Sequence, residues 1–116
     1  MKYELFATLY QEAFGYDDLE MYIAERGWQE WMDSFDNNKL GDILTSVYTL
    51  AKMTIKEMRE TKKLSRAQFS RIYNIPIRTL ENWDAETRKM TSYDKMLIAY
   101  TFFMDDFLGT DGERNE

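Results

Sequence analysis

The chain has 116 residues, no Cys, no His and one Pro, and its 15 Lys and Arg face 21 Asp and Glu, for a formal net charge of −6. Without Cys or His, no disulfide, thiolate metal site, imidazole base or His-based triad can form, so we expect no metal, no cofactor and no enzyme activity. With 44% hydrophobic and 16% aromatic residues, the chain has the material for a packed core rather than a disordered chain. Glu4 lies where a signal peptide needs an apolar run, and nowhere do 18 apolar residues follow one another, so we expect a cytoplasmic protein without membrane contact.

Residues 1–50 predict an acidic, aromatic-rich helical region. Apolar residues recur every three to four positions from Leu5 to Ala13 and again from Leu40 to Leu50, which is helical spacing. Between them, a helix is expected to begin at Asp17, as an N-terminal cap, and to end at Gly27. Four further apolar side chains are expected on one helical face: Trp28, Trp31, Met32 and Phe35.

The role of residues 1–50 stays open between two interpretations. The region has three basic and ten acidic residues, a net charge of −7. Its aromatic residues could form core against the rest of the chain. They could also form a dimer interface or bind a protein partner, because aromatic residues concentrate in interface cores.

Residues 51–104 carry eleven basic and six acidic residues, a net charge of +5, which is compatible with binding the phosphates of nucleic acid. Charges scattered over solvated faces would give similar totals. Ser or Thr followed three residues later by an acid or amide marks three helix starts, which begin at Thr54, Ser65 and Thr91. Together with Pro76, a residue suited to a first helical turn, these signals predict helices near 54–62, 65–73, 76–83 and 91–104.

The stretch from Leu64 to Trp83 predicts two short helices joined by a tight turn. The apolar face of the first helix would consist of Leu64, Phe69, Ile72 and Tyr73. Asn74 tolerates the left-handed conformation that such a turn requires, and Ile75 can fill the corner. In the second helix Leu80 and Trp83 would turn inward. This leaves a short polar and basic outward face with Ile77, Arg78, Thr79 and Asn82, as in a helix-turn-helix whose second helix enters a major groove.

The region 54–103 resembles the helix-turn-helix domain of the Xre family, the Cro and phage-repressor type. The matching positions are Leu64-Ser65, Phe69-Ser70, Asn74-Ile75, Thr79-Leu80 and Trp83-Asp84, followed by the basic pair Arg88-Lys89. The form Ile-Pro-x-Arg-Thr-Leu-x-x-Trp is similar to a subgroup frequent in Gram-positive bacteria and their mobile elements. Glu86 stands where a loop Gly is usual, and we expect it to leave the loop less free to take a positive φ. The resemblance implies an all-α fold, with a helical N-terminal extension on a lambda-repressor-like helix-turn-helix bundle.

The resemblance also implies a DNA-binding site. Ser65 would cap a helix near a phosphate, with Arg66 and Gln68 at the same end. The residues that would face the DNA bases or the DNA backbone are Ile77, Arg78, Thr79 and Asn82. The basic pair Arg88 and Lys89 would hold the flanking phosphates. The residue types fit, because Arg is bidentate to guanine and Asn to adenine. Arg78 could instead pair with Glu81 or Asn82, and Asn82 could be a solvated helix position.

We therefore expect three segments: the acidic region 1–50, a DNA-binding domain over 51–104 and an acidic flexible tail over 105–116, whose net charge is −4 from one basic and five acidic residues. The expected function is a sequence-specific transcriptional regulator, a repressor of a phage or mobile element that binds double-stranded DNA as a homodimer. The alternative is a counter-defence inhibitor of the anti-CRISPR kind, whose acidic surface binds a nucleic-acid-binding protein.

Overall fold

The computed structural model describes residues 1–108, and every regular element in that range is helical, as the all-α prediction requires. The elements in chain order are α1 (Tyr3–Ala13), α2 (Leu19–Ala24), the 3₁₀ helix η1 (Glu30–Ser34), α3 (Asn37–Lys52), α4 (Ile55–Thr61), α5 (Arg66–Tyr73), α6 (Ile77–Asp84), α7 (Ser92–Phe103) and the π-helical turn η2 (Met104–Leu108). Within this range no helix is both long and apolar enough to span a bilayer.

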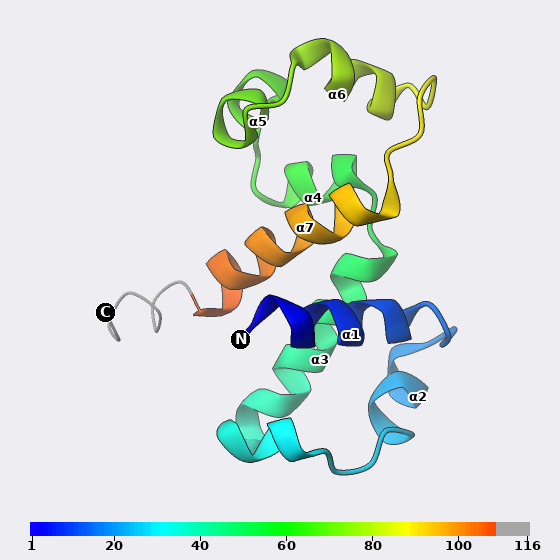
Figure 1. Cartoon of the computed structure of the whole chain (residues 1–116), viewed down its shortest axis with the longest axis vertical. Helices are drawn as coiled ribbons and strands as arrows, with labels where there is room; N and C mark the ends of the chain where they lie inside the picture. The colour runs from blue at the N-terminus through cyan, green and yellow to red at the C-terminus, as the bar shows by residue number, and fades with distance from the viewer. Residues whose placement is uncertain (109–116) are drawn as a thin grey trace.

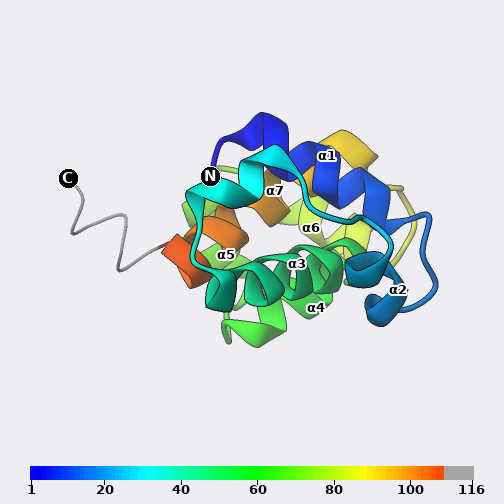
Figure 2. The ribbon, with the colours of Figure 1, turned by 90° about the horizontal axis from the view of Figure 1, so that it is seen from below.

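The helices form an elongated arrangement with α5 and α6 at one end (Figure 1). At the other end α1 and α2 both pack against α3, and Figure 2 shows α1 and α3 together from below. α7 crosses the middle of the molecule and contacts α1, α3 and α4. It therefore joins the N-terminal helices to the end that carries α5 and α6.

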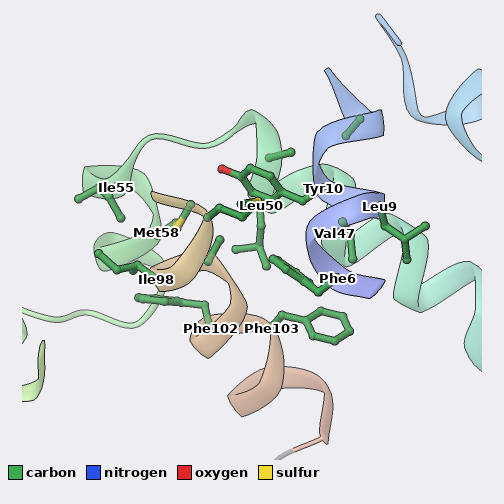
Figure 3. Close-up of a cluster of buried hydrophobic side chains, with 14 of the residues drawn as sticks. Phe6, Leu9, Tyr10, Val47, Leu50, Ile55, Met58, Ile98, Phe102 and Phe103 are labelled. Atoms are coloured by element: carbon green, nitrogen blue, oxygen red, sulfur yellow. The ribbon is translucent and has the colours of Figure 1, made fainter. Parts of the chain in front are cut away.

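One hydrophobic core runs through the middle of the molecule. Both the N-terminal region 1–50 and the segment 51–104 contribute side chains to it. Figure 3 shows side chains of α1, α3, α4 and α7 meeting in one cluster. Phe6 of α1 is fully buried, and its ring lies 5.2 Å from that of Tyr100 and 5.3 Å from that of Phe103, both on α7. The core of the C-terminal helices is thus completed by residues of the N-terminal ones.

Most of the predicted helix starts are confirmed. The side chains of Thr54 and Ser65 each accept a hydrogen bond from the backbone N–H three residues on. In return, the backbone N–H of each cap residue donates to the side-chain oxygen of Glu57 or Gln68. Thr91 accepts from the backbone N–H of Asp94. These interactions are local, so they form wherever the backbone begins a helix.

The prediction for residues 17–27 was wrong in its details. The cap is Asp18, which accepts from the backbone N–H of Met21 at 2.8 Å, and α2 stops at Ala24, three residues before Gly27. The buried hydroxyl of Tyr22 donates to the backbone carbonyl of Leu9 at 2.7 Å and fixes α2 against α1. Gly27 takes a left-handed φ of 65° and turns the chain towards η1.

At the C-terminal end, α7 continues as η2 to Leu108. The predicted acidic tail over 105–116 therefore begins within a helical turn, and residues 109–116 lie outside the described residues.

Candidate nucleic-acid interface

α5 and α6 are joined by the tight turn that the sequence predicts. Asn74 has φ 55° and ψ 45°, the left-handed conformation, and directly follows α5. The backbone N–H of Ile75 donates to the carbonyl of Ser70 at 3.1 Å, and the Ser70 hydroxyl donates back to the carbonyl of Ile75 at 2.6 Å. These paired bonds satisfy the backbone at the corner and fix the direction in which α6 leaves it.

α6 is held by one face and exposes the other. Leu80 is fully buried and Trp83 is half-buried against the core, as predicted. On the outward side Ile77 is 42% exposed and the side chain of Arg78 is 85% exposed. Thr79 lies between the two faces and is half-buried.

Asp84 anchors the C-terminal end of α6 through two guanidinium groups. Its side chain is 5% exposed, and Oδ2 accepts from Nη2 of Arg59 on α4 at 2.5 Å and from Nε of Arg66 on α5 at 2.9 Å. The hydrogen bond with Asp84 raises the pKa of Arg66. One carboxylate thus ties α4, α5 and α6 together, and its charge is neutralised within the protein.

This arrangement gives Arg66 a partner that the sequence analysis did not foresee. Arg66 was expected at a DNA phosphate, and the structure pairs it with Asp84 while about half of its side chain stays exposed. Arg59 was missed altogether. Its signal in the sequence is a basic residue on the apolar side of α4, one position after the buried Met58, but nothing local identifies a partner 25 residues away.

The two alternatives left open for Arg78 and Asn82 can be compared with the geometry. Nε of Arg78 lies 4.0 Å from Oε1 of Glu81, the outer limit of an ion pair, with both side chains exposed. Asn82 is half-buried, and its Oδ1 accepts from the hydroxyl of Thr87 at 3.3 Å. Its backbone carbonyl accepts from the N–H groups of Thr87 and Arg88. Arg78 is therefore the freer of the two side chains.

The remaining predicted site residues lie on either side of α6. Ser65 and Gln68 are exposed at the start of α5, where they form the reciprocal cap. Arg88 and Lys89 are exposed in the loop that follows α6. In this loop Glu86 has φ 59°, so it takes the positive φ that a residue with a side chain was expected to disfavour. The bond from its N–H to the carbonyl of Trp83 at 3.1 Å accompanies that conformation.

Ile72 also departs from prediction. It was assigned to the apolar face of α5, but it is 61% exposed. Phe69 and Tyr73 take the positions that face Phe102, with ring centroids 6.4 and 6.3 Å from it, and Ile72 falls at the edge of this contact.

Within residues 1–108 no group of three or more acidic side chains is arranged to hold a metal ion. No protein-family model matches the chain, and neither does any curated protein or solved structure.

Proposed function

We propose that the protein is a sequence-specific DNA-binding regulator of the Xre helix-turn-helix type, and that α6 enters the major groove of double-stranded DNA. The observation that carries the proposal is the pair α5 and α6 with its left-handed turn at Asn74. The turn leaves the start of α6 exposed, with Ile77 and Arg78 outward and Leu80 buried. A helix presented in this way can bring its first residues to base edges.

The distribution of charge supports the same proposal. Residues 51–104 have a net charge of +5, and Arg88 and Lys89 lie in the loop at the far end of α6. About half of the Arg66 side chain stays exposed while it pairs with Asp84. Arg66, Arg88 and Lys89 all lie near the C-terminal end of α6, where basic side chains are suited to the phosphates that flank the groove.

The proposal is tested by selecting bound duplexes from a random library at about 100 mM salt. We expect one enriched site, and we expect Arg78→Ala and Asn82→Ala each to weaken binding to it by about 1–3 kcal/mol per lost base contact. Lys2→Ala is the matched control, because it removes one positive charge from the opposite part of the sequence. No enriched sequence, or an equal loss in all three variants, would overturn the proposal.

We further propose that the regulator acts as a homodimer of a phage or mobile element and represses by occupying an operator. On α7, Tyr93 and Leu97 are exposed one helical turn apart and form an apolar surface that a second copy could cover. Sedimentation of the free protein and of the complex with the selected duplex measures this. A two-fold repeated site bound by two chains is the expected result.

The N-terminal surface supports a second candidate function, the binding of a protein partner. Met21 and Trp28 are exposed apolar side chains in the region that carries a net charge of −7. Such a surface suits a basic protein partner, as an inhibitor of a nucleic-acid-binding protein would require. This alternative is favoured if the duplex selection enriches no sequence and the chain then specifically captures a nucleic-acid-binding protein. Trp28→Ala should abolish that capture.

A further inference from the structure

A groove of about 510 Å³ lies beside α6, between the start of α4, the loop after α6 and the first turns of α7. Its size is within the range of about 300–1,000 Å³ that is typical of small-molecule sites. Four cationic side chains line it: Lys56, Arg88, Lys89 and Lys95. The groove is therefore a concave surface with positive charge from three separate parts of the chain.

The protein neutralises only part of this positive charge. Two carboxylates line the groove: that of Asp84 is already shared between Arg59 and Arg66, and that of Glu86 offsets one of the four cations. Glu57 also acts electrostatically on Lys95. In the part of the chain that the structure describes, no carboxylate lies within ion-pair distance of Lys56, Arg88 or Lys89. An anion bound here would supply the missing negative charge.

Lys95 is the most enclosed of the four cations. It is half-buried, and its Nζ donates to the backbone carbonyl of Ala51 at 3.0 Å. The rings of Tyr10 and Phe14 lie about 5.9 and 5.8 Å from the same Nζ atom. Burial lowers the pKa of Lys95. A charge in such surroundings interacts with a bound anion more strongly than a fully hydrated one.

Trp83 adds a flat apolar surface to the groove. It is half-buried, and its indole N–H donates to no residue among those described. The other two tryptophans differ in this respect, since Trp28 donates to Asp33 and Trp31 to Gln29. Trp83 can therefore offer both a ring face and a free donor to a ligand.

We propose that this groove binds a phosphorylated small molecule with at least two negative charges and a planar ring, of the nucleoside diphosphate class. Lys56, Lys95 and the pair Arg88 and Lys89 bind its phosphates, and Trp83 contacts its ring. Because Arg88 and Lys89 are also the residues proposed for DNA phosphates, the bound molecule competes with DNA. This regulatory consequence rests on the proposed function, whereas the anion site itself does not.

The site is tested by titrating the isotopically labelled full chain with ADP, pyrophosphate and adenosine, and by following its amide and indole NMR signals. We expect saturable shifts with ADP at the Trp83 indole and at Lys56, weaker binding of pyrophosphate and none of adenosine. Lys56→Ala should weaken ADP binding about fivefold or more, as loss of a charge-assisted hydrogen bond does. Lys2→Ala, with the same loss of charge outside the groove, should bind as the wild type does.

Two results would overturn the proposal: no saturable shift with millimolar ADP, or equal weakening by Lys56→Ala and Lys2→Ala, which indicates diffuse attraction only. The spectrum of each variant shows directly whether it is folded.

A second arm adds ADP to the complex with the selected duplex, and displacement of the duplex is expected. If the protein selects a duplex but does not bind ADP, only the proposed anion site in the groove is wrong. If the protein binds ADP but selects no duplex, only the proposed DNA-binding function is wrong.

Discussion

At the scale of single residues, removal of the Asp84 carboxylate is predicted to destabilise the fold strongly. Its removal leaves the guanidinium of Arg59 buried without a counter-charge, and Nε of Arg59 already has no hydrogen-bond partner among the described residues. We expect Asp84→Ala to lower the free energy of unfolding by about 3–5 kcal/mol, the cost of breaking a buried pair from one side. Urea denaturation measures the change. Glu81→Ala, on the same helix but exposed, should change it by less than about 1 kcal/mol, and equal losses would contradict the role given to Asp84.

Two buried tyrosines form a second comparison. The hydroxyl of Tyr22 donates to the carbonyl of Leu9, whereas the buried hydroxyl of Tyr10 has no hydrogen-bond partner within residues 1–108. Burial raises the pKa of both side chains, that of Tyr10 to about 12. We expect Tyr22→Phe to cost about 1 kcal/mol of stability and Tyr10→Phe to cost nothing or to stabilise, because it removes an unsatisfied polar group. Thermal or urea unfolding of the two variants tests this, and the reverse order would contradict it.

At the scale of elements, the junction of α5 and α6 depends on one backbone conformation. Asn74 has φ 55°, which a side chain with a Cβ and no compensating polar group adopts at a cost of about 1–2 kcal/mol. Asn74→Ala should therefore destabilise the protein by about 1 kcal/mol, while Asn74→Gly should stay within about 0.5 kcal/mol of the wild type. Unfolding curves of the pair measure the difference. If both variants lose the same stability, the side chain of Asn74 matters for another reason than its φ.

The same junction shows what the sequence could predict. The caps at Thr54 and Ser65 and the turn at Asn74 rest on interactions between residues at most five apart, so their signals are legible in the sequence. The link between Arg59, Arg66 and Asp84 spans 25 and 18 residues, and only the packing of α4, α5 and α6 brings these side chains together. The predicted site residues follow from the family resemblance, which does not indicate that Arg66 has an acidic neighbour 18 residues away.

Packing also overrode local signals elsewhere in the chain. Ile72 has the apolar character and nearly the spacing of a core residue, but the contact with α7 is centred on Phe69 and Tyr73. In α2, Asp17 and Asp18 both carry a cap signal, and the structure has Asp18 as the cap, with the hydroxyl of Tyr22 bonded to Leu9 of α1. Periodicity therefore located the helices well, but the faces they bury depend on partners that are distant in the sequence.

At the scale of the whole molecule, the basic and acidic halves share one hydrophobic core. α7 belongs to the basic half by sequence, but it packs against α1 and α3 of the acidic half as well as against α4. The two halves therefore divide the surface charge between them without dividing the core. The end that carries α6 therefore belongs to the basic half of the sequence, while the core beneath it includes helices of the acidic half (Figure 1).

This shared core predicts that residues 51–116 do not fold alone. Without α1, the rings of Tyr100 and Phe103 lose their contacts with Phe6, and without most of α3 the core loses the buried side chains of Val47 and Leu50. We expect the fragment to show a broad, weakly cooperative thermal transition by circular dichroism, whereas the full chain melts cooperatively. Phe6→Ala in the full chain should cost about 3–5 kcal/mol, because it leaves a cavity at the same junction. A fragment with a sharp transition and dispersed amide signals would show that the C-terminal helices suffice for their own core. The 51–116 segment would then be an independent domain on which the N-terminal helices are an addition.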